Sequence, residues 1–378
     1  MIYLDNAATS FPKPESVYRA MDEFARTKLA NPGRAGHKMA TAAEQALDEG
    51  RHLLNQLFHG TAPERFVFTL NCTDALNMAF KGTLRPGDHV VTTDLEHNSV
   101  SRPLRALELA GVIRLTRVNA DAGGTVDPGA VKAALTPQTR LIAMTHASNV
   151  LGTVQPIAEV GRLARERDLL FVVDAAQTAG VVPIDVQAMY IDLLAFPGHK
   201  GLMGPTGTGA LYVGPRAELR AWREGGTGGD SSSETQPREL PYFLEGGTPN
   251  VLGVAGLNAG IRYVQERGLE AIRRHEVELT QRLAARLDEL GCQIQGHRDA
   301  ARRVGTLSFT TEAFSASDLG TILDVDFNVA IRPGLHCAPY VHRAQGTFPD
   351  GTVRVSPGPF STRDDIDHLA QALGEIIH

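Results

Sequence analysis

Lys200 stands at the end of an apolar run, in the sequence DLLAFPGHKGLMGPTGTGALYV. Most lysines are surface residues, so a solvated loop lysine is one reading. The glycines that follow allow a ligand to approach the backbone closely, and ligands of open α/β sheets bind where strands end. A lysine amine can also form a Schiff base with a carbonyl compound. These features together favour Lys200 as part of a binding site.

Asp174 ends a second apolar run, in LLFVVDAAQTAG. A carboxylate that follows five apolar residues must find a cationic partner or become protonated. An aspartate that caps the next helix is the alternative. The functional reading pairs Asp174 with the protonated pyridine nitrogen of pyridoxal phosphate, which keeps the ring an electron sink. On this reading Lys200 carries the cofactor.

A place for the phosphate is predicted in residues 69–80, TLNCTDALNMAF, which read as a strand, a turn and a helix. The amino end of a helix offers free N–H groups and a favourable dipole to an anion. Cys72 and Thr73 open this helix, so we expect them to lie against the phosphate.

Three cysteines occur, Cys72, Cys292 and Cys337, and their wide spacing fits neither a disulfide framework nor a paired metal site. No metal is expected. Cys337 lies in IRPGLHCAPYVHR, where a Pro-Gly turn and the neighbours His336, His342 and Arg343 could favour a reactive thiolate. We therefore predict that Cys337 is a nucleophile, with a buried structural thiol as the alternative. The other two cysteines are read as structural by default.

The segments that must position these residues alternate between strand and helix patterns from about residue 60 to 215. Apolar runs rich in β-branched residues fall at 65–70, 89–93, 112–118, 140–146, 169–174, 191–196 and 208–213, with helical periods at 73–82, 99–111 and 157–168. This pattern predicts an α/β fold with a mostly parallel sheet. Polar residues follow five of the strands and should converge at one edge: Cys72-Thr73, Glu96-His97, Asn149, Asp174 and His199-Lys200.

Length and composition are those of an ordinary soluble globular protein. The 378 residues exceed what one core comfortably holds, so a large and a small lobe are expected. Apolar residues make up 42% and charged residues 21%, with a net charge of -6 and no basic block, so nucleic acid is not an expected partner. No apolar run has the roughly 20 residues of a membrane span, and the first residues do not resemble a signal peptide. We expect a cytoplasmic protein without a membrane partner.

The C-terminal third predicts a smaller α+β lobe. Long amphipathic helices at 261–290 and 363–378 flank strands at 304–310 and 352–356. Residues 223–249, rich in Gly, Ser and Pro, could be a linker. The apolar residues at their centre, Leu240 and Tyr242 to Leu244, instead suggest a loop that packs, either on its own chain or on a partner subunit.

Taken in order, these residues resemble the class V aminotransferases of pyridoxal phosphate fold type I, and within them the cysteine desulfurases of the second, SUF-like subgroup. The likeness covers nearly the whole chain and is carried by the motifs YLDNAATS, GRAGH, NCTDALN, EHNS, SNVLGT, VDAAQ, GHKGLMGPTGTG, EGGTPN, RPGLHCAP and VRVS. Any one of them is weak, but ten in the family's order are specific. The resemblance implies a large domain of residues 15–255 and a small domain of 1–14 and 256–378.

The resemblance also implies a role for each motif residue. Lys200 would hold the cofactor and, once freed by substrate, move the Cα proton. Cys337 would be the second catalytic residue, and His97 a third that stacks on the ring. The remaining assignments are Asp174 on the pyridinium, Gln177 on the phenolic oxygen, Cys72, Thr73 and His199 on the phosphate, Thr248 on the phosphate of the neighbouring subunit, and Asn149, Arg354 and Ala7 near the substrate. Arg354 would bind the α-carboxylate through its planar guanidinium.

The implied reaction converts L-cysteine to L-alanine and leaves the sulfur on Cys337 as a persulfide, for iron–sulfur clusters or another sulfur pathway. A homodimer with shared active sites and a sulfur-acceptor protein would follow. Pro197 and Cys72 depart from the family pattern, which usually has hydroxyl side chains there, so the phosphate could have fewer side-chain donors. The alternatives are a selenocysteine lyase, another class V lyase or aminotransferase, and a catalytically inactive relative that serves as a scaffold.

Overall fold

The computed structural model describes residues 1–33, 36–227 and 232–377. A seven-stranded sheet forms its centre, with strand order β2-β8-β7-β6-β5-β3-β4. The strands are β2 (Phe66–Thr69), β3 (Asp88–Thr93), β4 (Ile113–Val118), β5 (Thr139–Thr145), β6 (Leu170–Asp174), β7 (Leu193–Pro197) and β8 (Gly209–Val213). Only β8 runs antiparallel to its neighbours. The predicted α/β fold with a mostly parallel sheet is confirmed.

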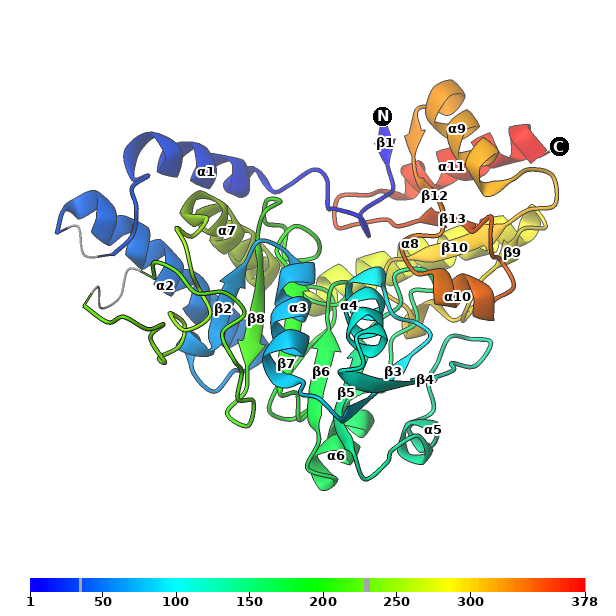
Figure 1. Cartoon of the computed structure of the whole chain (residues 1–378). Helices are drawn as coiled ribbons and strands as arrows, with labels where there is room; N and C mark the ends of the chain where they lie inside the picture. The colour runs from blue at the N-terminus through cyan, green and yellow to red at the C-terminus, as the bar shows by residue number, and fades with distance from the viewer. Residues whose placement is uncertain (34–35, 228–231, 378) are drawn as a thin grey trace.

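Both faces of this sheet are buried, which explains why its strands read as continuous apolar runs. Successive residues of β5 and β6 point to opposite faces. Leu141 and Val172 join α3 (Cys72–Thr83) and α4 (Asn98–Leu109) on one face, which is the front in Figure 1. Ile142 and Val173 join α2 (Lys38–Phe58), α5 (Pro128–Ala133) and α6 (Ile157–Glu166) on the other.

The C-terminal lobe is built on a four-stranded antiparallel sheet of order β12-β13-β10-β9. Its elements are β9 (Gln293–Ile294), β10 (Leu307–Thr310), β12 (Arg332–Gly334), β13 (Thr352–Val355), α8 (Leu269–Glu289), α9 (Ala316–Phe327), α10 (Pro339–Ala344) and α11 (Arg363–Ile377). A short 3₁₀ turn at Ala300–Arg302 lies between β9 and β10, and another, at Pro63–Arg65, precedes β2. The N-terminus returns to this lobe, because β1 (Ile2–Tyr3) pairs with β11 (Val329–Ala330) and Leu4 is buried in its core.

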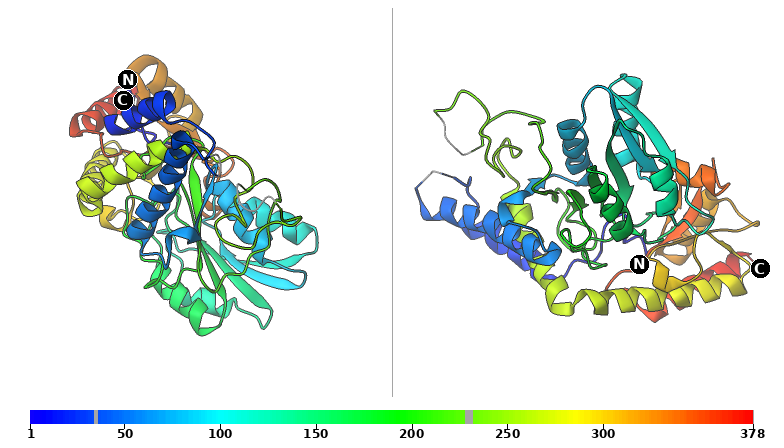
Figure 2. Two further views of the ribbon diagram at one scale, coloured as in Figure 1. Left: turned by 90° about the vertical axis from the view of Figure 1, so that its left-hand side faces the viewer. Right: turned by 90° about the horizontal axis from the view of Figure 1, so that it is seen from below.

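Gly268 divides the long amphipathic stretch at 261–290 into α7 (Val251–Arg267) and α8. It adopts φ +81° between the two helices, a conformation that glycine tolerates best. α7 packs on α1 (Glu15–Thr27) and α2, whereas α8 extends toward the C-terminal sheet, as the right-hand view of Figure 2 shows. The predicted domain boundary at residue 255 therefore falls inside α7, and the division into 15–255 and the rest stays a prediction.

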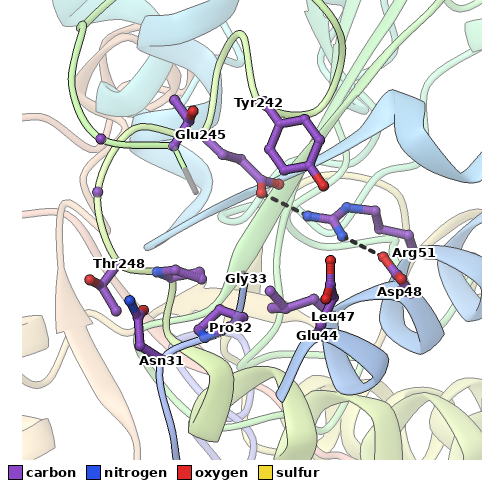
Figure 3. Close-up of a pocket in the computed structure, with 14 residues that line it drawn as sticks. Asn31, Pro32, Gly33, Glu44, Leu47, Asp48, Arg51, Tyr242, Glu245 and Thr248 are labelled. Carbon is purple, nitrogen blue, oxygen red and sulfur yellow. Dashed lines mark hydrogen bonds and ion pairs between the residues drawn. The ribbon is translucent and has the colours of Figure 1, made fainter. Parts of the chain in front are cut away.

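The glycine- and serine-rich segment 223–249 packs on the large lobe. Leu244 is buried, and Leu240 and Phe243 contact the same cluster. Glu245 accepts a hydrogen bond from the Phe68 main chain (2.7 Å) and forms an ion pair with the buried Arg51 (2.7 Å). Figure 3 shows this pair in a cavity of about 310 Å³. Residues 228–231 of the segment, and Arg34 and Ala35 of the GRAGH motif, lie outside the described residues.

Among the residues that the structure describes, no helix is long and apolar enough to cross a membrane.

Candidate active site

Asp174 and Lys200 end adjacent strands and lie together in the fold. Asp174 is 3% exposed, and burial raises the pKa of its carboxyl while the Ala176 N–H (2.9 Å) and the nearby Lys200 charge oppose that rise. Burial likewise lowers the pKa of the Lys200 amine, with Asp174 opposing. Within the described residues Asp174 forms no ion pair. A buried carboxylate without a cation is costly and points to a cationic ligand group.

Cys72 lies beside this carboxylate. Its thiol is 3.4 Å from Asp174 Oδ1, at the first residue of α3, and burial together with Asp174 raises the thiol pKa well above its usual range. The neutral S–H can therefore donate to Asp174. The side chain of Cys72 thus faces the carboxylate, and its predicted contact with a phosphate stays a prediction.

The amino end of α3 carries Thr73, an exposed residue whose hydroxyl lies 3.0 Å from Ser99 Oγ at the start of α4. His97 caps α4, because its Nδ1 accepts from the Ser99 N–H (3.0 Å). Burial lowers the His97 pKa to about 4, helped by the positive charges of Lys200 and three arginines. The imidazole is therefore neutral at physiological pH.

His199 leads directly into Lys200 and is fixed through its main chain. Its carbonyl accepts from Thr9, Ser10 and Lys13. Its buried Nδ1 has no partner among the described residues. An orphaned ring nitrogen of this kind suits a ligand that the protein leaves room for.

Gln177 and Ala7 border Lys200 from another side. Gln177 Nε2 donates to the Ala7 carbonyl (3.1 Å), and the Ala7 N–H donates to Ser356 Oγ (2.9 Å). Gln177, Ala7 and Lys200 line one cavity of about 40 Å³. The N-terminal segment therefore forms part of the site wall.

Arg354 and Asn149 join the two lobes. Arg354, 1% exposed on β13, donates to the Asn149 carbonyl (3.0 Å) and forms an ion pair with Asp5 (2.7 Å). The Arg354 Nε has no hydrogen-bond partner within the described part of the chain. Asn149 in turn donates through Nδ2 to the His336 carbonyl (2.7 Å). Arg354 is thus held with part of its guanidinium uncommitted.

Cys337 is presented by a strained turn. His336 and Cys337 both adopt left-handed backbone conformations, with φ +48° and +58°, which non-glycine residues rarely do. Two hydrogen bonds hold this turn: the Asn149 side chain donates to the His336 carbonyl, and the Asn98 main-chain N–H donates to the Cys337 carbonyl (2.7 Å). Since strain persists only where the surroundings enforce it, these contacts fix the turn that carries the thiol at the start of α4.

Arg332 is the cation that contacts this thiol, at 3.5 Å from Nη2 to Sγ. None of the neighbours suggested by the sequence supplies this contact. Burial lowers the pKa of His336 to about 2 and of His342 to about 4, so both are neutral. Arg343 instead lies over the rings of Tyr340 and Phe348.

Removing the Arg332 charge should slow the reaction of Cys337 with iodoacetamide. The Arg332 guanidinium contacts the sulfur that attacks the reagent and stabilises the negative charge that this sulfur carries as it reacts, so Arg332→Gln should slow alkylation about 5-fold at neutral pH. Cys72 and Cys292 are buried, so the fast phase reports on Cys337. Arg343→Gln is the matched control and should react at the wild-type rate. Equal rates for Arg332→Gln and wild type would show that Arg332 does not activate the thiol.

Glu276 lines the same small cavity as Lys200 and Gln177. It forms no ion pair among the described residues, and the Arg273 charge opposes the effect of burial on its pKa only from beyond ion-pair distance. Burial raises its pKa from 4.5 to about 7, although the Gly305 N–H donates to it. The folded state thus binds this proton more tightly than the unfolded chain. Glu276 therefore lowers the free energy of unfolding progressively as pH rises from about 4.5 to 7, and the loss of stability is complete above pH 7.

Glu276→Gln should accordingly stabilise the protein at pH 8, by about 2 kcal/mol, and by only about a quarter as much at pH 5. Glutamine keeps an acceptor for Gly305 without the buried charge. Urea unfolding at the two pH values measures the difference, with the exposed Glu266→Gln as control. A gain of equal size at both pH values would contradict the role of ionisation.

Thr248 is not part of this cluster. It is exposed and lines the separate cavity of about 310 Å³ beside Arg51, Tyr242 and Glu245 (Figure 3). Its predicted contact, a phosphate in a neighbouring subunit, does not require it to lie near Lys200 of its own chain and stays a prediction.

The fold and this site define an enzyme of the class-V aminotransferase family: the family model "Aminotransferase class-V" matches residues 2–369, and the chain belongs to this family. Its curated relatives include a probable cysteine desulfurase of Methanothermobacter thermautotrophicus, 38% identical over 99% of this chain and 94% of the relative. Another, of Halalkalibacterium halodurans, is 35% identical over 99% and 92%. The prediction that the chain belongs to the cysteine desulfurase family is confirmed, and so is the prediction that it is an enzyme.

Solved structures agree. A cysteine desulfurase of Thermococcus onnurineus in its apo form superimposes with a TM-score of 0.94, at 34% identity, over 100% of this chain and 94% of the other. The cysteine desulfurase CsdA of Escherichia coli, in an S-sulfonic acid form, gives 0.87 at 29% identity over 99% and 94%.

Three residues with contacts in the site, Arg332, Asp5 and Ser99, were not predicted from the sequence to have a role there. Arg332 lies in the motif IRPGLHCAPYVHR and was given no role, because only the pairing of β12 with β13 shows that it lies opposite Arg354. Asp5 lies in the motif YLDNAATS, which hinted at function without a role. Ser99 lies in EHNS and gave no signal of its own.

Proposed function

We propose that this protein is a pyridoxal-phosphate-dependent cysteine desulfurase that converts L-cysteine to L-alanine and holds the sulfur on Cys337 as a persulfide. The observation that carries the proposal is the position of Cys337. The Asn98 main chain and the Asn149 side chain hold its strained turn against the end of the sheet that bears Asp174 and Lys200. An incidental cysteine would not need such a turn.

The donor set suits pyridoxal phosphate. Asp174 is a buried carboxylate without an ion-pair partner among the described residues, as a pyridinium nitrogen requires. The amino end of α3, the Thr73 hydroxyl and the orphaned Nδ1 of His199 offer donors for a phosphate. A side chain at Gly198, just before His199, would collide with Thr208 Oγ1, so the turn at Lys200 is closely packed. When bound, the cofactor would supply an electron sink for the bonds at Cα.

The chain's own residues would divide the remaining work. Lys200 would hold the cofactor and then carry the Cα proton, since the lowered pKa of its amine makes the neutral, basic form accessible. Arg354 would bind the substrate carboxylate with the guanidinium edge that Asp5 and Asn149 leave uncommitted. His97, Gln177, Asn149 and Ala7 would border the ring and the substrate.

Cys337 would accept the sulfur. Its thiolate attacks the substrate sulfur, so that an S–S bond forms while the Cβ–S bond breaks. The electron pair of the broken bond stays with the carbon fragment, which takes up a proton and leaves as alanine. Arg332, 3.5 Å from the thiol, would stabilise the thiolate before the attack.

The proposal includes a homodimer with shared active sites. Thr248 supports it, because this exposed residue lines a different cavity from Lys200 and would be able to contact a second copy. A sulfur-acceptor protein, use of the sulfur for iron–sulfur clusters and a cytoplasmic location complete the proposal on the resemblance to the family.

Alanine production from L-cysteine, L-selenocysteine and L-cysteine sulfinate tests the function. Purified enzyme supplied with pyridoxal phosphate should release alanine from L-cysteine in multiple turnovers when a thiol reductant removes the sulfur. Turnover of selenocysteine alone would instead establish a selenocysteine lyase. Failure to act on any of the three would support an inactive relative or a different class V reaction.

A further inference from the structure

Ser99 contacts two residues that the proposed function places on different parts of the cofactor. Its hydroxyl lies 2.7 Å from His97 Nδ1 and 3.0 Å from Thr73 Oγ1, and the side chain is buried. Thr73 is a predicted phosphate donor, and His97 is predicted to stack on the ring. Ser99 is thus a direct physical link between them.

The direction of these hydrogen bonds follows from the main chain. The Ser99 N–H donates to His97 Nδ1 (3.0 Å), so this nitrogen carries no proton. The neutral imidazole must then carry its proton on Nε2. Because Nδ1 can only accept, Ser99 must donate its one hydroxyl proton in the contact with His97. Thr73 must therefore be the donor in its contact with Ser99.

A phosphate would compete for the Thr73 proton. If Thr73 donates its hydroxyl proton to a phosphate oxygen, it can no longer donate to Ser99. The hydrogen bond between the two hydroxyls then persists only if Ser99 turns its own proton toward Thr73. That rotation withdraws one of the two donors from His97 Nδ1. The main-chain N–H of Ser99 remains, so Nε2 stays protonated throughout.

We propose that Ser99 is a positioning residue that links occupancy of the phosphate site at Thr73 to the hydrogen bonding of His97, while the Ser99 main chain keeps the His97 proton on Nε2. The inference rests on the proposed function for its ligand, although the hydrogen-bond network belongs to the protein alone.

NMR of ring-¹⁵N-labelled histidines in the purified apoprotein tests the link. Inorganic phosphate is the probe, because it can fill the phosphate site without placing a cofactor ring beside His97. The His97 signals are assigned by their loss in His97→Gln. Wild type should show an unprotonated Nδ1 and a protonated Nε2. Saturating phosphate should move the Nδ1 signal downfield, as expected for an acceptor that loses a donor.

Two variants separate this link from a general effect of phosphate. Ser99→Ala should start with Nδ1 already downfield and show no response to phosphate, whereas Ser99→Thr, which keeps the hydroxyl, should respond as wild type does. Ser101→Ala is the matched control. The Ser101 hydroxyl donates to the His97 carbonyl (3.3 Å) and to no other group among the described residues, so this variant should leave the response intact.

A protonated Nδ1 in wild type, or the same phosphate response in Ser99→Ala as in wild type, would overturn the inference and leave the proposed function untouched. Failure of both phosphate and pyridoxal phosphate to bind the apoprotein would overturn the cofactor proposal and this inference with it.

Discussion

Lys200→Ala should lower alanine release from L-cysteine by at least about 1,000-fold. The substitution removes the group proposed to hold the cofactor and to move the Cα proton, and a positioned acid or base alone contributes about 10²- to 10⁴-fold. It also leaves Asp174 without the positive charge that opposes its raised pKa. Single-turnover alanine formation with saturating pyridoxal phosphate measures the loss, so that weaker cofactor binding is not mistaken for it.

Lys200→Arg separates charge from proton transfer. Arginine keeps the positive charge near Asp174 but remains protonated at all working pH values. It should therefore be as inactive as Lys200→Ala. Lys132→Ala, an exposed lysine on α5, is the control and should keep wild-type activity. Substantial activity in Lys200→Arg would show that Lys200 is not the base.

Cys337→Ser should lower alanine release by about 100-fold or more while cofactor binding stays unchanged. A serine hydroxyl keeps the shape of the strained turn but is a far weaker nucleophile than a thiolate at neutral pH. Steady-state alanine formation and the visible absorbance of the bound cofactor, measured on one preparation, separate the two effects.

Cys292→Ala is the control for Cys337→Ser. Cys292 is buried in the core of the C-terminal lobe, away from the site residues, so its loss should leave the activity intact. Alanine release at the wild-type rate in Cys337→Ser would remove the persulfide mechanism and favour another class V lyase.

The parallel sheet and the residues at its edge could be predicted from the sequence because their signals are local. Strands such as Leu170–Asp174 are buried on both faces and therefore read as unbroken apolar runs, and each polar residue that follows such a run is placed by its strand. For this reason Asp174 and Lys200 could be expected to meet although 26 positions separate them.

The contacts that join the lobes could not be predicted in this way. Asn149 and His336, or Asp5 and Arg354, are far apart in the sequence, and their pairing depends on how the C-terminal sheet docks. The identity of the charged residue beside Cys337 could not be predicted either. Proximity in sequence favoured His336 and His342, but burial keeps both neutral, and the antiparallel pairing of β12 with β13 places Arg332 there instead.

One single-turnover experiment tests the central claim most directly. The enzyme is mixed with an equimolar amount of L-cysteine labelled with a heavy sulfur isotope, alkylated and digested, and its cysteine peptides are analysed by mass spectrometry alongside alanine. We predict one labelled sulfur atom on Cys337 for each alanine formed, and none on Cys72 or Cys292. Alanine formed together with free sulfide and an unmodified Cys337 would contradict the account.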